Sequence, residues 1–269
     1  MRFWHRPALT RRHYLSEFLT MHDRVLNSLI ARAALAVAGI LALAPGTRGD
    51  DPSAEHPLNV PPAGFVALFN GKDLTGWKGL VLNPNLRPTL SAEEHAEKQK
   101  EADERMHKHW KVVDGALMFD GAAFNLSGPL CTVKQYGNFE MLVDWKISKG
   151  GDSGIYLRGS PQVQIWDPDD PSQQKHGAGK GSGGLWNNEK NERFPLVRAD
   201  NPIGEWNSLR IRMVGDRVTV WLNGKLVTDN VVMENYWDRK KPIFPREQIE
   251  LQNHNHPLYF RNIFIKELP

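Results

Sequence analysis

The sequence is poor in cysteine, with Cys131 as the single one among 269 residues. One cysteine cannot form an internal disulfide, so an exported form of this chain would depend on core burial for its stability. No cysteine lies near residues 45–50, so a lipid anchor at that point is not indicated.

The sequence also lacks a hydrophobic run that could span a bilayer. Its apolar stretch "AALAVAGILALA" covers residues 33–44 and is shorter than the ~20 residues of a membrane helix. Basic residues before it and turn residues after it are typical of a signal peptide, and a buried core helix is the alternative. We expect a leader at 1–49, cleavage before Asp50, and a bacterial protein that is periplasmic or secreted, with no stable membrane insertion after cleavage.

The sequence that follows this leader has no excess of positive charge. Residues 1–49 hold seven of the 34 Lys and Arg but only two of the 31 Asp and Glu. The remainder is therefore slightly acidic, although the whole sequence has a pI near 8.9. Because no basic field remains to attract phosphates, we expect no nucleic-acid partner.

After a linker at 50–62, most of the sequence alternates between apolar and polar side chains, as half-buried strands do. The clearest stretch is 138–148, which is expected to place five apolar side chains on one face: Phe139, Met141, Val143, Trp145 and Ile147. Asp-Gly and Asn-Gly turn signals separate such stretches. Short strands at regular spacing predict an all-β sandwich or jelly roll over residues 63–269.

Two segments interrupt the strand pattern. Residues 91–109 predict a helix, with Ser91 and Glu94 spaced as a capping box. We expect a helical insertion at 90–109 that lies on the sandwich surface, with a place at the rim of a pocket as the alternative. Residues 167–206 are rich in Gly, Pro, Asn and Asp, and a loop of this length is usually functional or disordered. Its "GAGKGSGG" lacks the spacing of a phosphate-binding loop.

The stretch "GGDSGIYLRGSPQVQIWD" (150–167) predicts two strands joined by a Gly-Ser-Pro turn. Alternation places Tyr156 and Arg158 on one face of the first strand, opposite its apolar side chains. The second strand would carry Gln162, Gln164 and Trp166 on the corresponding face. A solvated outer face is one interpretation. Planar amides with an aromatic ring are also what a sugar site uses for hydroxyl pairs and for the apolar side of a pyranose.

Six ordered segments resemble the 3-keto-disaccharide hydrolase family: "LFNGKDLTGW", "WKVVDGALMF", "LCTVKQYGNFEMLVDWKI", "GGDSGIYLRGSPQVQIWD", "GEWNSLRIRMVGDRVTVWLNGKLV" and "IELQNHNHPLYFRNIFIKEL". The resemblance spans residues 64–268. It implies a concanavalin A-like jelly-roll β-sandwich, a small-molecule carbohydrate partner, and cleavage of glycosides whose sugar carries a ketone at carbon 3. The helix at 91–109 then reads as an insertion.

That chemistry has requirements of its own. A ketone at carbon 3 makes the hydrogen on carbon 2 acidic. Removal of this hydrogen as a proton gives an enolate, which expels the group at carbon 1. Water then adds to the enone that results. The enzyme needs a base near carbon 2, a donor or cation at the ketone oxygen, and an acid for the leaving oxygen. Ordinary glycosidases instead use two carboxylates.

The candidate catalytic residues are His254, Arg158, Asp152, Glu140 and Asp144. His254 titrates in the range of a base or acid, and Arg158 is a permanent cation for the enolate. A loop histidine without a role and a structural ion pair of Arg158 with Asp144 or Asp152 are the alternatives. A glucanase pattern, Glu-x-Asp-x-x-Glu, is not completed in "FEMLVDWK".

The candidate substrate-binding residues are Gln162, Gln164, Trp166, Asp167, Trp186 and Gln252. For the tryptophans, core packing is the common alternative. A divalent cation is left open, either calcium at Asp167, Asp169 and Asp170 or a metal held by His254 and carboxylates. A non-catalytic carbohydrate-binding module of the same fold is the alternative function.

Overall fold

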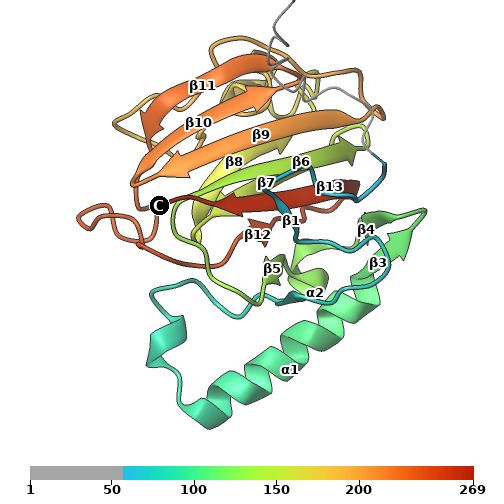
Figure 1. Ribbon diagram of the computed structural model, residues 1–269, viewed down its shortest axis with the longest axis vertical. Coiled ribbons are helices and arrows are strands. Elements are labelled where there is room, and N and C mark those ends of the chain that lie inside the picture. The colour runs from blue at the N-terminus through green and yellow to red at the C-terminus, as the bar shows by residue number, and fades with distance from the viewer. Residues whose placement is uncertain (1–56) are drawn as a thin grey trace, which may run out of the picture. The chain divides into compact units, whose positions relative to one another are not determined.

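The structure, a computed structural model, describes residues 57–269, so the expected leader and residues 50–56 of the expected linker lie outside it. Strands dominate these residues and form two antiparallel sheets (Figure 1). The predicted all-β sandwich is confirmed.

The larger sheet has eight strands in the order β11–β10–β9–β6–β13–β4–β3, with β1 pairing to β13 beside this path. Its members are β1 (Val66–Ala67), β3 (Trp110–Val113), β4 (Ala116–Asp120), β6 (Phe139–Ile147), β9 (Asn207–Val214), β10 (Arg217–Leu222), β11 (Lys225–Val232) and β13 (Pro257–Glu267). Along β6 every second residue is buried, and the buried ones are the five apolar side chains predicted to share a face. This face of the sheet therefore points to the core.

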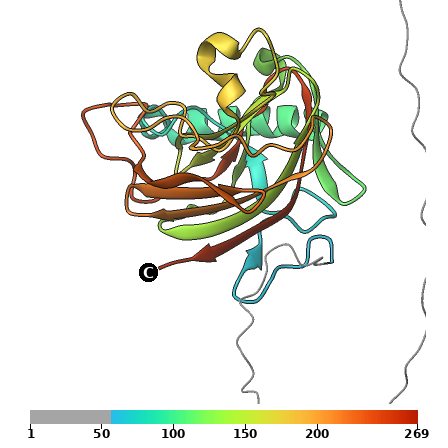
Figure 2. The same cartoon turned by 90° about the horizontal axis from the view of Figure 1, so that it is seen from above.

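The smaller sheet has five strands in the order β2–β5–β12–β7–β8. Its members are β2 (Trp77–Gly79), β5 (Leu130–Thr132), β7 (Asp152–Leu157), β8 (Ser160–Trp166) and β12 (Glu250–Leu251). The short helical turns are η1 (Arg87–Thr89), α2 (Phe124–Ser127), η2 (Gln174–His176) and η3 (Ala178–Lys180). Figure 2 shows η2 and η3 (gold) on the side of the sandwich away from β9–β11 (orange).

One hydrophobic core joins the two sheets. Met141 and Phe260 of the larger sheet and Ile155 and Ile165 of the smaller one are buried together in it. Truncating such a side chain to alanine costs about 2–5 kcal/mol, because apolar contact is lost and a cavity remains. Since the core lies between the sheets, the outer face of the smaller sheet is free to carry polar groups.

Helix α1 (Ala92–His109) covers the edge of the smaller sheet (Figure 1). The capping box at Ser91 and Glu94 is present. The Gly79 N–H at the end of edge strand β2 donates to Asp103 Oδ1 at 2.8 Å, and Gln99 Nε2 donates to the Gly79 carbonyl at 2.8 Å. The helix thus satisfies backbone groups that an open sheet edge would offer to another chain. Among residues 57–269, no helix combines the length and apolar character that a bilayer crossing requires.

Gly79→Ala tests this close contact. A Cβ at Gly79 would lie 2.2 Å from the Ala102 carbonyl oxygen, so helix and strand would have to move apart. We expect a loss of about 1–3 kcal/mol in the free energy of unfolding by urea, as for other overpacked sites. The exposed Glu104→Ala on the same helix is the control, with a change within about 0.5 kcal/mol. Equal stabilities for the two variants would contradict the proposed tight docking of α1.

Candidate functional site

A cleft of about 420 Å³ opens on the outer face of the smaller sheet. The floor of the cleft comes from β7, β8 and the chain after β12: Asp152, Tyr156, Gln162, Gln164, Trp166, Gln252 and His254. The wall of the cleft comes from two loops: Gln173, His176, Trp186, Asn187, Tyr236 and Trp237. Its volume is in the range of small-molecule sites, which hold about 300–1,000 Å³.

Strand register gathers the floor residues. Gly154 pairs with Gln164, and Asp152 pairs with Trp166, so side chains of β7 and β8 form successive rows across the sheet. Pairing extends beyond β12, since the Gln252 N–H donates to the Gly154 carbonyl at 2.9 Å. A Cβ at Gly154 would lie 2.4 Å from Gln162 Oε1, so the glycine makes room for that amide.

Three floor residues form a buried relay of hydrogen bonds, the amide relay of Gln162, Gln164 and Asp152. Gln162 Nε2 donates to Gln164 Oε1, and Gln164 Nε2 donates to Asp152 Oδ1 at 2.7 Å. Because the carboxylate can only accept, these bonds fix which way both amides point. Gln162 Oε1 is left buried without a partner in the protein, and so is Gln252 Oε1. Both are acceptors that call for a donor from a ligand.

The relay ends at an acid–base pair. Asp152 Oδ2 lies 4.0 Å from His254 Nδ1, and the exposed fractions of the two side chains are 19% and 42%. Burial raises the pKa of Asp152, while His254 and the hydrogen bond from Gln164 oppose the rise. A carboxylate in this position can orient the imidazole and stabilise its charged form, and the imidazole remains open to a ligand.

Aromatic rings form most of the wall. Trp186 Nε1 donates to the His176 carbonyl at 3.0 Å, and the Arg193 guanidinium lies 4.8 Å from the Trp186 ring centroid. The ring of Trp166 meets that of Trp186 edge-on at 6.2 Å. On the other loop Trp237 Nε1 donates to the Gly159 carbonyl at 2.7 Å. The indole N–H groups are therefore occupied, and the rings are held as fixed apolar surfaces.

The outer edge of β8 is paired with the loop at 167–206. Gln164 N–H donates to the Gly184 carbonyl at 2.9 Å, and Gly183 N–H donates back to the Gln164 carbonyl at 2.8 Å. Every residue of β8 is buried as a result. The solvated-face interpretation of Gln162, Gln164 and Trp166 is therefore wrong.

Glu234 ties the two wall loops together. Its carboxylate accepts the N–H groups of Glu189, Lys190 and Asn191 at 3.1, 2.7 and 2.9 Å. The Arg239 guanidinium also donates to it, at 3.1 Å. Partial burial pushes the pKa of Glu234 upward, but the hydrogen bonds from the three backbone groups outweigh it and lower the pKa to about 2. The carboxylate is thus ionised at all physiological pH values.

Arg158, predicted to stabilise the enolate, does not line the cleft. It has a left-handed φ of 51°, so the alternation that places Tyr156 on the outer face ends before it. Its buried guanidinium donates to the Pro245 carbonyl at 3.1 Å and to the Gly215 carbonyl. The alternative, an ion pair with Asp144 or Asp152, is not formed either, and these carbonyl contacts take its place.

Glu140 and Asp144 also lie away from the cleft, because β6 belongs to the larger sheet. Glu140 accepts from Arg210 Nε at 2.6 Å, and Asp144 accepts from Ser208 Oγ at 2.5 Å. Their positions on the polar face of β6 were predicted, but alternation does not tell which sheet a strand joins.

Asp167 is buried and does not line the cleft; its carboxylate accepts the N–H groups of Gly150 and Asp169, each at 2.9 Å. Asp169 pairs with Arg198, and Asp170 accepts from Ser172, so the three aspartates do not converge on a calcium site. In the part of the chain that the structure describes, no group of three or more His, Cys, Asp or Glu side chains could hold a metal.

The structure thus places Asp152, Gln162, Gln164, Trp166, Trp186, Gln252 and His254 of the predicted site residues in the cleft. The prediction missed Tyr156, Gln173, His176, Asn187, Tyr236 and Trp237. Of these, Tyr156 carried a signal, because it alternates on the same face of β7 as Asp152. The others come from loops, where side-chain direction does not follow a period.

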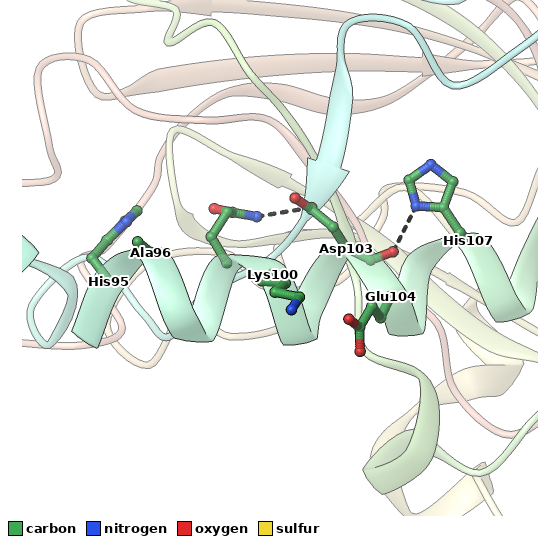
Figure 3. A pocket seen from close by; sticks show the side chains of 7 residues that line it. His95, Ala96, Lys100, Asp103, Glu104 and His107 are labelled. Atoms are coloured by element: carbon green, nitrogen blue, oxygen red, sulfur yellow. Dashed lines mark hydrogen bonds between the residues drawn. The ribbon is translucent and has the colours of Figure 1, made fainter. Parts of the chain in front are cut away.

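A second, shallow hollow lies on the exposed side of α1 (Figure 3). Asp103 there is engaged by Gln99 Nε2 at 2.9 Å, and the His107 ring nitrogen Nδ1 donates to the Asp103 carbonyl at 2.7 Å. Its polar groups serve the helix and its contact with β2, so we take the cleft on the smaller sheet as the functional site.

Glu234→Gln tests the tie between the wall loops. In the folded protein the pKa of Glu234 lies below its ordinary value of 4.5. The ionised carboxylate therefore stabilises the fold fully above pH 4.5, and this contribution is lost as the pH falls toward 2. We expect the variant to be less stable at neutral pH by about 1–3 kcal/mol, the range for hydrogen bonds to a charged group. Urea unfolding should show this difference shrinking below pH 4.5. The exposed Glu192→Gln in the same loop is the control; a pH-independent difference for Glu234→Gln would refute the role of its charge.

Comparisons with known proteins agree with this fold. A 3-keto-disaccharide hydrolase from Bacteroides thetaiotaomicron is 23% identical over 260 residues, which cover 78% of this chain and 81% of that protein. A candidate glycosyl hydrolase from Parabacteroides distasonis aligns with a TM-score of 0.59 and 25% identity, over 79% of this chain and all of that one. A second structure from the same organism has a TM-score of 0.53 and 24% identity, over 77% of this chain and 85% of the other.

The sequence model of one family covers nearly all of the sandwich, from residue 64 to residue 266. This match agrees with the resemblance seen in the sequence motifs. The chain belongs to the family of 3-keto-alpha-glucoside-1,2-lyase-like domains.

Proposed function

We propose that this chain cleaves glycosides whose sugar carries a ketone at carbon 3, 3-keto-disaccharides among them. Family membership and the name of the Bacteroides relative support this substrate class. The composition of the cleft supports a sugar ligand, because its lining combines amides with unpartnered oxygens, Gln162 and Gln252, and fixed aromatic rings. Hydroxyl groups would donate to the amides while one side of the pyranose packs on a ring.

The observation that carries the mechanism is the pair of Asp152 and His254 in the cleft. In the proposed reaction His254 removes the proton from carbon 2, and the electron pair forms an enolate with the ketone. The bond between carbon 1 and the leaving oxygen then breaks, and that oxygen takes a proton from the His254 imidazolium, which becomes neutral again. Water adds across the resulting double bond, with hydroxide at carbon 1 and a proton at carbon 2. Asp152 orients the imidazole and stabilises its protonated form.

The number of carboxylates in the cleft also argues against a conventional glycosidase mechanism. Among the described residues that line the cleft, Asp152 is the only carboxylate. A mechanism through an oxocarbenium ion uses two carboxylates on either side of the glycosidic bond. Elimination does not need a second carboxylate across the glycosidic bond, so the composition of the cleft fits it better.

His254→Ala tests the proposal with a 3-keto glycoside deuterated at carbon 2. The wild-type protein should exchange the deuterium for solvent hydrogen during turnover. The variant should lose at least ~100-fold in kcat, a typical effect of removing a general base. His107→Ala on α1, which removes an exposed histidine outside the cleft, is the matched control and should keep the wild-type rate. Products that retain all of the deuterium would rule out the elimination mechanism.

Two further arms of this assay address the alternatives. Binding of 3-keto glycosides by the wild-type protein without any product would favour a carbohydrate-binding module. A loss of rate in the presence of a chelator, restored by a divalent cation, would add a metal ion to the site.

A further inference from the structure

The proposed elimination needs a donor at the ketone oxygen, and Arg158 does not supply it. Among residues 57–269, no lysine or arginine lines the cleft. The indole N–H groups of Trp166, Trp186 and Trp237 are all bonded to backbone carbonyls. The Nε2 of Gln164 is likewise taken up by Asp152 and by two backbone carbonyls.

The hydroxyl of Tyr156 is a free donor on the floor of the cleft. It accepts a long hydrogen bond from Gln252 Nε2 at 3.4 Å, which leaves its own proton available. The Tyr156 hydroxyl and the His254 imidazole both line the cleft, so it holds a neutral donor as well as a base.

Glu250 lies directly opposite Tyr156 in the register of β12 and β7. Its side chain is buried, with the residue 2% exposed, and its Oε1 has no hydrogen-bond partner in the protein. The other ionisable groups around it are Cys131, opposite on β5, and the ion pair of Arg87 and Glu247 at 2.5 Å. Arg87 is thus committed to Glu247, and Glu250 has no cation of its own.

We infer that Tyr156 is a catalytic residue that donates a hydrogen bond to the ketone oxygen as the enolate forms, and that Glu250 is a positioning residue beside it. The inference rests on the proposed function, since it assigns a part of the same reaction. Neutral donors aimed at a developing oxyanion in a site shielded from water are an effective means of stabilising it.

The ionisation of both groups agrees with these roles. Burial, and then the proximity of Glu250, raises the pKa of the Tyr156 hydroxyl, so it stays protonated and acts as a donor. Burial raises the pKa of Glu250 to about 8, with Arg87 opposing the rise and Glu247 adding to it. Below pH 8 Glu250 is therefore neutral, as a carboxylic acid in an apolar site can be. Above pH 8 its charge would oppose the enolate charge, and the rate should fall.

Tyr156→Phe is the first test, measured as kcat and KM on a 3-keto glycoside. Loss of one oxyanion donor should lower kcat by ~100- to 1,000-fold and change KM little. Exchange of the hydrogen on carbon 2 should slow in parallel, because the enolate itself is destabilised. Tyr259→Phe, which removes a hydroxyl from β13 of the other sheet, is the matched control. A variant with a higher KM and the wild-type kcat would overturn the catalytic role.

Glu250→Gln is the second test, and it does not depend on the first variant. Glutamine cannot ionise, so the fall in rate above pH 8 should disappear. The ratio of kcat above pH 8 to kcat below pH 8 should then be at least ~5-fold higher than in the wild type, an effect that one charge at close range can produce. The unfolding temperature of the variant should rise relative to that of the wild type between pH 4.5 and pH 8, because the folded wild type keeps the Glu250 proton that its unfolded chain loses, and the difference should stay constant above pH 8. An unchanged alkaline limb would overturn the role of Glu250.

These outcomes separate the inference from the proposed function. An active wild-type protein with a fully active Tyr156→Phe variant would refute the inference and leave the function standing. A wild-type protein inactive on all 3-keto glycosides would remove both.

Discussion

The hydrogen bond from Gln164 Nε2 to Asp152 Oδ1 is the constraint on which the cleft depends. A partly buried carboxylate needs a donor, and this amide on the neighbouring strand is one that reaches it. Once Gln164 is oriented by this bond, Gln162 must turn its own N–H toward Gln164. The free acceptor at Gln162 Oε1 and the position of the carboxylate beside His254 both follow from that one contact. The chemistry of the site is therefore set by strand pairing between β7 and β8.

The sandwich can carry this polar surface without losing stability, because only the inner face of the smaller sheet packs in the core. The inner face supplies apolar side chains such as Ile155 and Ile165 to the core. The outer face is covered by loops whose own order comes from backbone pairing at Gly183 and Gly184 and from the Glu234 carboxylate. Buried polar groups on the floor are thus shielded from water without being needed for the stability of the core.

Strand alternation is the part of this arrangement that the sequence predicts. It placed Gln162, Gln164 and Trp166 on one face of their strand, because side chains in a strand repeat every two residues. It failed for Glu140 and Asp144, since a period of two assigns a face but not a sheet. It failed for Arg158 because a residue with positive φ breaks the period. The wall residues come from loops, whose geometry follows from tertiary contacts that have no local signal.

The charges around the cleft bear on the kind of reaction it can support. Within the described part of the chain, its lining holds a single carboxylate and no lysine or arginine, and Glu250 beside it is neutral below pH 8. A site of this composition is poorly suited to hold an anionic substrate or to stabilise a lasting cation. It suits the proposed reaction of a neutral sugar, in which negative charge would appear only briefly as a proton leaves carbon for the imidazole of His254. A fixed arginine at the ketone would bind the ground state as well, whereas a neutral tyrosine hydroxyl responds chiefly to the charge of the enolate, which is the state that catalysis must stabilise.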